Sequence, residues 1–392
     1  MKLISFLSAI GLGLLAVAPP INYNIPLIVN SFNWCYLVIA AGLFGMFLLF
    51  CDIHWLIKGV IIYLFINCFL SQVPYLSFNA YILCVFSVYC FMLFRVIDKA
   101  ILLNMLAAVF WLQFILVFFQ MIGMDKLLNF GAVMVLSPEG QAIGTELSEV
   151  QKPVFLGTVM QYMRLASLIA ILSPFLLIKS KWYIIPITLM VLVSKSSGLA
   201  LSVIAGVFTY VSLLFRKDFL RIAIVCFVLA VLYLFYDLGS FMGAVNPAHG
   251  GRLSSWYAIF ITWFIDTSKS TIAPFLYGPF NLKWFLFGHG MDTFLPLFPV
   301  YKHDINPFPQ AHNCWLQFLW EIGAVGTSFI AFYVGSLAKR LYKRKEYLML
   351  SGMACLGTNM FFAFPTRMTQ TKLLLICYLA FCEKQLSKRR LK

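Results

Sequence analysis

Charged side chains are scarce in this chain, and acidic side chains are the scarcest. Only 11% of the 392 residues are Asp, Glu, Lys or Arg, and Asp and Glu together number 14. Apolar residues make up 62% of the chain and aromatic residues 17%. A soluble domain cannot cover so much hydrocarbon with so few charges, whereas helices buried in lipid can. The composition therefore excludes a soluble protein and predicts an all-α polytopic integral membrane protein.

Motifs for metal or disulfide chemistry are also absent. The sequence has no C-x-x-C pair, no H-E-x-x-H motif and no cluster of acidic residues that could hold a metal ion. Nine of its ten cysteines lie in or at the ends of apolar segments, where free thiols act as small packing residues. We therefore expect no metal, no cofactor and no disulfide framework.

Apolar runs recur along the whole chain. Most are roughly 18 to 22 residues long, which is enough to cross a bilayer as a helix. We expect the first run to stay uncleaved although it resembles a signal peptide, because two prolines follow its last small residues. The last two runs are short, which predicts tilted or partly protein-buried helices. The twelve candidate spans are residues 3–18, 34–51, 55–72, 77–94, 101–122, 161–178, 182–195, 197–215, 219–236, 314–337, 348–363 and 371–383.

Lysines and arginines gather on one side of these predicted spans. Basic residues in short loops are retained on the cytoplasmic side of a membrane. With both termini cytoplasmic, 19 of the 29 basic residues fall on that side. The net charge of +15 is thus a signal of topology. No nucleic-acid-binding motif accompanies it, so we expect membrane lipids and no nucleic acid among the partners.

Two predicted outward segments interrupt the spans. Residues 123–160 contain acidic and turn residues and predict a lid or rim without a recognisable motif. Residues 237–313 contain four of the five histidines, and we expect this large loop to carry the catalytic chemistry. The other predicted units are the N-terminal spans at 1–122, the central spans at 161–236, and the C-terminal spans with a basic tail at 314–392.

Short motifs lie in and after the large loop. Gly250-Gly251-Arg252 comes first, Gly288-His289-Gly290 forms a glycine turn, and Ala311-His312-Asn313 leads into a span that carries Glu321-Ile322-Gly323. In this order, and on one side of the membrane, they resemble the O-antigen ligase and polymerase superfamily over roughly residues 153–330. The resemblance implies a GT-C-like fold and a metal-independent, inverting glycosyltransferase. It also implies a bacterial inner (cytoplasmic) membrane with a periplasmic active site.

The resemblance implies a donor glycan carried on undecaprenyl diphosphate. The acceptor is lipid A core in the ligases, a second carrier-linked glycan in the polymerases, and a protein in a third branch, the protein O-oligosaccharyltransferases. Our first interpretation is a ligase, although no residue separates it from a polymerase. A transporter for lipid-linked glycans would also need about a dozen spans. Transporters typically carry internal repeats and broken helices at the midplane, and we find no convincing repeat here.

Three residues are predicted to be catalytic. A departing lipid diphosphate gathers negative charge, which the bidentate guanidinium of Arg252 could stabilise. Lys195 stands between two spans, just before a predicted helix start whose dipole also favours phosphate, where the family usually has an arginine. His312 would remove the proton of the acceptor hydroxyl, because imidazole titrates near neutral pH. The alternatives are headgroup anchoring for Arg252, snorkelling for Lys195 and a hydrogen bond at a helix start for His312.

Other residues are expected to support the site. Arg164 and Arg367 lie near outward ends of spans, where they could line a phosphate groove or anchor to headgroups, and both readings remain open. Asn313 is expected to order the loop of His312 and to contribute to substrate binding.

Glu321 is the one acidic residue in its span, and such residues are costly and often functional. On an unbroken helix it would lie about 13 Å deeper than the catalytic histidine and on the opposite face. We therefore interpret Glu321 as a hydrogen-bonding brace between helices. Gly288 and Gly290 are expected to shape the turn of their motif.

Overall fold

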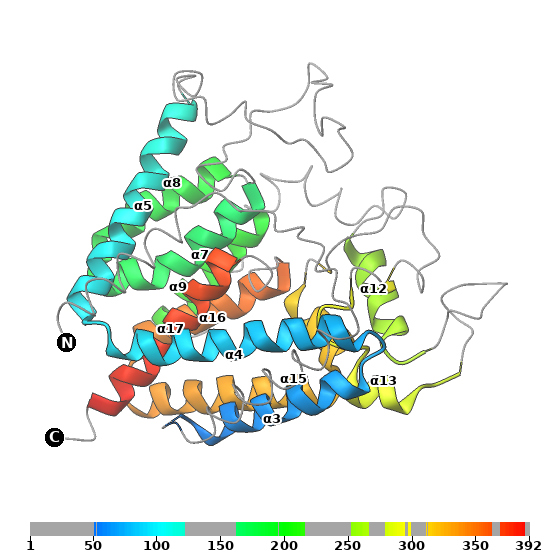
Figure 1. Cartoon of the computed structure of the whole chain (residues 1–392). Coiled ribbons are helices and arrows are strands. Elements are labelled where there is room, and N and C mark those ends of the chain that lie inside the picture. The colour runs from blue at the N-terminus through cyan, green and yellow to red at the C-terminus, as the bar shows by residue number, and fades with distance from the viewer. Residues whose placement is uncertain are drawn as a thin grey trace, which may run out of the picture.

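The computed structural model of this chain is built from helices (Figure 1). In the part of the chain that it describes, the one β-type pairing is an isolated bridge between Ile265 and Phe280. This agrees with the prediction of an all-helical protein of membrane type. The described residues are 51, 53–121, 162–194, 196–215, 252–265, 279–294, 297–298, 311, 313–362 and 369–388.

The predicted spans within the described residues all contain helices. Two short helices, α12 (Arg252–Thr262) and α13 (Leu282–Phe287), belong to the large loop, and a 3-10 turn, η2 (Lys181–Tyr183), precedes α8. The predicted spans at 3–18 and 219–236, and nearly all of 34–51, lie outside the described residues. The remaining helices are α3 (Trp55–Leu70), α4 (Pro74–Val96), α5 (Lys99–Met121), α7 (Tyr162–Lys179), α8 (Ile184–Ser194), α9 (Ser197–Leu214), α15 (Cys314–Lys343), α16 (Tyr347–Phe362) and α17 (Thr369–Lys388).

The helices differ in how far they could reach across a bilayer. Among the described residues, α4, α5 and α15 are long and apolar enough to cross a membrane. Helix α8 has 11 residues, which gives a rise of about 16 Å, roughly half the hydrocarbon thickness. Three of the described helices could therefore cross a membrane by length and composition, while the count of twelve spans stays a prediction.

Helix starts follow local sequence signals. Helix α4 begins at Pro74, where the missing N–H costs no hydrogen bond. The Asp98 carboxylate accepts a hydrogen bond from the N–H of Ala100 at 2.8 Å, in the first turn of α5. The Ser196 hydroxyl accepts one from the N–H of Leu199 at 3.4 Å and caps α9. Helix α9 thus begins at Ser197, at the serines that follow Lys195, as the sequence predicted.

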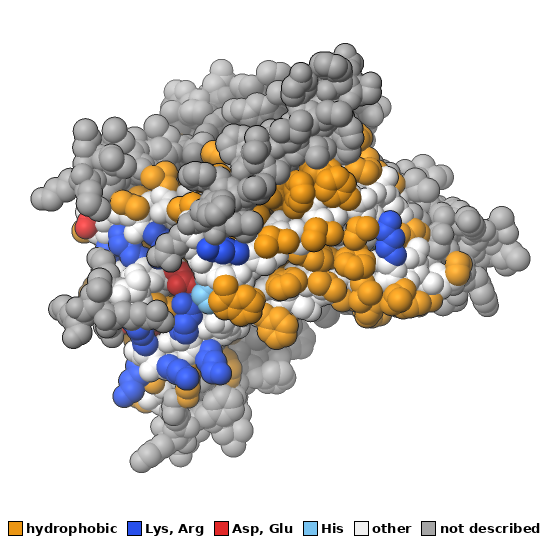
Figure 2. Space-filling model, turned by 60° about the horizontal axis from the view of Figure 1, so that its bottom comes forward, with side chains coloured by type: hydrophobic (Ala, Val, Ile, Leu, Met, Phe, Trp, Pro, Cys, Tyr) orange, Lys and Arg blue, Asp and Glu red, His pale blue; other side chains and the backbone are white. Residues whose placement is uncertain are grey.

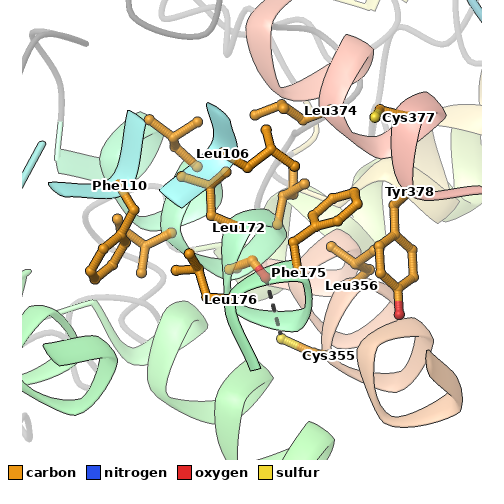
Figure 3. Packing of buried hydrophobic residues seen from close by; sticks show 14 of the residues in the cluster. Leu106, Phe110, Leu172, Phe175, Leu176, Cys355, Leu356, Leu374, Cys377 and Tyr378 are labelled. Carbon is orange, nitrogen blue, oxygen red and sulfur yellow. Dashed lines mark hydrogen bonds between the residues drawn. The ribbon is translucent and has the colours of Figure 1, made fainter. Parts of the chain in front are cut away.

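The main core forms around α7, which packs against α5, α8, α9, α16 and α17. Its residues 165–172 are all buried, as expected for a helix that is apolar on every side. Figure 3 shows Leu172, Phe175 and Leu176 pointing among side chains of neighbouring helices. The Phe175 ring meets the Tyr378 ring edge-on with centroids 5.1 Å apart.

A proline inside α7 is compensated by a neighbouring helix. Pro174 has no N–H, so the carbonyl of Ala170 loses the donor it would have in a regular helix. The thiol of Cys355 on α16 points at this oxygen, at 3.6 Å (Figure 3). The Tyr378 hydroxyl on α17 also donates a hydrogen bond to the Met349 carbonyl on α16, at 2.7 Å.

A second group of helices positions the candidate site. Helices α3, α4 and α15 run lengthwise through the lower part of Figure 1, with α12 and α13 beyond one end. Helix α3 contacts both α4 and α15, and α13 contacts α15. The end of this group that carries α12 and α13 is called the loop end below, and the end where α4, α15 and α17 terminate is called the basic end.

We expect Gly352→Ala to destabilise the α7–α16–α17 core. A Cβ at this position would lie 2.6 Å from the Pro174 Cβ and would overlap the Tyr378 hydroxyl, displacing its hydrogen bond. Overpacking of this kind costs about 1 to 3 kcal/mol. The measurement is the thermal unfolding midpoint in detergent. The matched control is Gly357→Ala on the same helix, where an added Cβ meets nothing within 4 Å. Equal midpoints for the two variants would contradict this packing.

Candidate functional site

Helix α15 is broken at Gly323, and the break is the centre of the candidate site. Gly323 has φ 64° and ψ −175°, inside a helix that is otherwise continuous from Cys314 to Lys343. Only glycine adopts this conformation readily. A Cβ here would also lie 2.5 Å from the Phe287 backbone nitrogen and overlap the Leu286 carbonyl. Both the backbone angle and the close approach of α13 therefore require glycine.

The break frees carbonyl groups, and the glycine turn after α13 supplies donors for them. The carbonyl oxygens of residues 320–322 accept hydrogen bonds from the N–H of His289 at 2.9 Å, the N–H of Gly290 at 2.9 Å and the hydroxyl of Tyr63 at 2.6 Å, in that order. Each acceptor would otherwise be an unpaired polar group beside lipid or packed side chains, which is costly. The turn and the broken helix thus satisfy one another.

Two glycines let the turn approach so closely. Gly288 has φ +73°, and a Cβ on it would lie 2.5 Å from the Glu321 carbonyl carbon and oxygen. Gly290 has φ +117°, and a Cβ there would collide with the Ser71 hydroxyl. Both positions favour glycine by backbone angle and by space.

The corner between α3 and α4 holds the other side of the turn. The Asn67 amide donates to the Phe287 carbonyl at 2.5 Å. The Ser71 hydroxyl and the Gln72 N–H both donate to the His289 carbonyl, at 3.3 and 3.0 Å. The Ser77 hydroxyl donates to the Met291 carbonyl at 2.9 Å. The backbone from 287 to 291 is therefore clamped between two helical elements.

His289 occupies an enclosed aromatic slot at this turn. Its ring stacks on Trp320 at 4.0 Å between centroids and lies 4.5 Å from Trp284. Its Nε2 lies 3.0 Å from the Thr262 carbonyl, an acceptor, so this nitrogen carries the proton. The side chain is fully buried. His289 therefore joins the end of α12 to the turn and has no open face for a substrate.

The start of α12 lies beside the residue that precedes His312. The Trp256 indole N–H donates to the Ala311 carbonyl at 2.9 Å. Arg252 is the first residue of α12, one helical turn before Trp256. Asn313 is buried and caps α15, with its side-chain oxygen accepting from the N–H groups of two residues in the first turn at 3.0 and 3.1 Å. Two motifs far apart in sequence thus meet at the loop end.

The structure describes the predicted functional side chains only in part. Lys195, His312 and Arg367 lie outside the described residues. Arg164 stands in the first turn of α7 and Arg252 at the start of α12, but their side chains are not among those described. Their roles therefore stay predictions. The backbone brings Arg252 and the neighbours of His312 to one region.

Glu321 is buried next to the break. Its carboxylate accepts a hydrogen bond from the Gln317 amide at 3.0 Å, one turn earlier on the same helix. The helix is continuous from Cys314 to Ile322, so Glu321 lies well below the start of α15. Its role as a brace between helices stays a prediction.

The depth of the break follows from the length of the helix after it. The segment from Ala324 to Lys343 is 20 residues long, about 30 Å, which matches the hydrocarbon thickness of a bilayer. With Lys339, Arg340 and Lys343 of its last turns at headgroup level, the rest of this segment crosses most of the apolar layer when the helix stands upright. The break and the turn then fall near one membrane surface, and the basic end of α15 falls near the other.

Sequence reasoning missed the residues that clamp the turn. Tyr63, Asn67, Ser71 and Ser77 read as ordinary members of apolar spans. Their common signal is a polar group in an apolar segment that must find a partner. Gly323 was recognised as part of the Glu321-Ile322-Gly323 motif, but nothing in the sequence predicted that the helix breaks at this residue.

Comparisons with family models, curated proteins and solved structures found no match to this chain. The resemblance to O-antigen ligases and polymerases therefore depends on the sequence motifs. Within the described residues, no group of three or more His, Cys, Asp and Glu side chains could hold a metal ion.

We expect Gly323→Ala to displace the 287–291 turn from α15 and to destabilise the protein. The substitution forces a side chain into a glycine-only conformation and against the α13 backbone, which costs about 3 kcal/mol or more. The unfolding midpoint in detergent measures the loss. Gly335→Ala on the same helix is the matched control, because nothing lies within 4 Å of an added Cβ there. A stable Gly323→Ala protein with an unchanged midpoint would show that the helix is not broken here.

We expect Asn313→Ala to loosen the first turn of α15. The variant removes the cap from the N–H groups of Trp315 and Leu316 and costs about 1 kcal/mol. Asn313→Ser should retain most of the stability, because serine is also a good cap. Hydrogen exchange of these two amides is the readout. If both variants exchange at the wild-type rate, Asn313 does not cap the helix.

Proposed function

We propose that this protein is a membrane glycosyltransferase of the O-antigen ligase type, with a GT-C-like fold. It would move a glycan from an undecaprenyl diphosphate carrier to lipid A core at the periplasmic face of a bacterial inner membrane. The observation that carries the proposal is the contact of Trp256 with Ala311. It brings the helix that begins with Arg252 next to the residue before His312, the two motif positions assigned to opposite halves of the reaction.

The proposed reaction needs two kinds of group on the two sides of one bond. His312 removes the proton from the acceptor hydroxyl while the acceptor oxygen bonds to the anomeric carbon. The bond from that carbon to the diphosphate oxygen breaks, with inversion, and the lipid diphosphate leaves. Arg252 and Lys195 offset the negative charge that develops on the diphosphate. Proton, bond and charge are then balanced without any further reactant.

The structure of the loop end supports the proposal of an enzyme that acts at a membrane surface. The turn from 287 to 291 and the broken helix form a rigid base under the region of Arg252 and Asn313. Rigid support of this kind holds reacting groups in place. The estimated depth of the break, near one surface of the apolar layer, suits a donor whose diphosphate lies at the headgroup level.

A transporter of lipid-linked glycans is the second candidate, because transporters often use broken helices. In transporters the freed carbonyls of such a break typically line the binding site. Here the carbonyls of residues 320–322 are taken by backbone and tyrosine donors. The estimated position of the break is also near a surface rather than the midplane. Both observations favour the enzyme.

The test is transfer by the purified full-length protein in detergent. The donor is an undecaprenyl diphosphate-linked oligosaccharide, the acceptor is lipid A core, and the readouts are glycosylated core and released lipid diphosphate. We expect His312→Ala to lower the rate by at least about a hundredfold and Arg252→Gln by about a hundredfold or more. Lys195→Arg should retain activity, because it keeps the positive charge and adds a guanidinium that can bind phosphate with two hydrogen bonds.

Lys283→Gln is the matched control, because Lys283 is an exposed cation on α13 in the same loop. It should leave the rate unchanged, and all variants should keep the wild-type unfolding midpoint. Lengthened carrier-linked glycan without core transfer would identify a polymerase, and transfer to a protein would identify a protein O-oligosaccharyltransferase. Failure to cleave the donor with any acceptor would revive the transporter.

A further inference from the structure

A cavity of about 420 Å³ opens at the basic end, far from the loop end. The final turns of α4, α15 and α17 surround it together with the residue that caps the start of α3. Figure 2 shows Lys and Arg side chains gathered at this end of the molecule, around acidic and histidine side chains, beside a wide apolar surface. The charged residues that line the cavity are Arg95, Arg340, Lys343, Arg344 and Glu383.

Positive charge dominates this cavity. Its four cations face a single carboxylate, that of Glu383, which the Arg340 guanidinium holds with two hydrogen bonds of 2.5 and 3.0 Å. The excess is three positive charges. Each helix C-terminus contributes about half a negative charge, so the ends of α4, α15 and α17 together cancel only about half of this excess.

One of these cations also caps the end of a helix. The Arg344 guanidinium donates to the Leu386 carbonyl near the end of α17. Capping explains this arginine, but it does not explain why Arg95 and Lys343 from two other helix ends line the same cavity. Lys343 is exposed, so its ammonium can reach a ligand without breaking a bond that holds the fold.

His54 adds a neutral donor to the wall. Its Nδ1 accepts the N–H of Leu56 at 3.3 Å, which leaves the ring proton on Nε2. Burial and the positive charge of Arg340 lower the pKa of His54, and Glu383 opposes them only partly. The lowered pKa favours the neutral form of the ring. Cations together with a neutral N–H donor form a suitable wall for phosphate oxygens.

We infer that this cavity binds a phosphate group, supplied by the headgroup of an anionic phospholipid. Basic pockets between helix ends at a membrane surface have this preference. We place the cavity at headgroup level for two reasons. It lies about 30 Å from the break in α15, one hydrocarbon thickness along the helix. Trp55, next to His54, is 68% exposed, as aromatic residues at the membrane interface are.

The test uses the full chain in detergent, equilibrated with equal amounts of phosphatidylglycerol and phosphatidylcholine, and native mass spectrometry of the lipids it retains. We expect preferential retention of phosphatidylglycerol. Lys343→Gln should weaken that preference about fivefold, and the double variant Arg95→Gln with Lys343→Gln should abolish it. The matched control is Lys339→Gln, an exposed lysine on the same helix that does not line the cavity. It should behave as wild type.

Equal retention of the two lipids by the wild type, with no effect of inorganic phosphate on its unfolding midpoint, would overturn the inference. An effect of Lys339→Gln as large as that of Lys343→Gln would overturn it too, because the preference would then reflect general charge. A second arm identifies the source of the phosphate. If inorganic phosphate raises the midpoint in phosphatidylcholine and phosphatidylglycerol does not, the cavity binds the free anion. If phosphatidylglycerol raises it and phosphate does not, the lipid is the ligand.

Discussion

The arrangement of the loop end depends on one requirement: every backbone polar group that is shielded from water needs a hydrogen-bond partner. A helix meets this requirement alone until Gly323 interrupts it and frees the carbonyls of residues 320–322. The glycine turn at 288–290 and Tyr63 restore the partners. The close approach needed for these bonds explains the glycines on both sides of the contact. It also brings α12 and the start of α15 together above the turn.

Composition and hydropathy were enough to predict the helical architecture. Long apolar runs predicted the ends of α3, α4, α5, α7 and α9 to within about three residues, because burial in lipid leaves a strong signal. The expected helix start after Lys195 was also found, with Ser196 capping α9. Hydropathy does not report how far a run continues as helix, so it could not show that α8 is only 11 residues long.

The candidate site was less accessible to sequence reasoning. The glycine turn and the His-Asn pair could be recognised as motifs, because they are local. Their partners could not, because Asn67 and Tyr63 lie more than 200 residues away along the chain and resemble other polar residues in apolar helices. The depth assigned to Glu321 assumed an unbroken helix. That assumption holds down to Ile322 and fails at the next residue, where a backbone angle decides.

The long sequence separations at the turn also set an order of assembly. Asn67 and its acceptor, Phe287, are 220 residues apart, a distance that a ribosome covers in roughly 10 to 45 s. During that interval α3 and α4 are already synthesised, while their polar side chains still await the partners that the later half provides. Until α15 arrives, the nascent N-terminal half is an incomplete bundle with unsatisfied groups. Incompletely assembled chains are the species on which chaperones act, and a translation stop between α9 and α15 would leave the protein in that state.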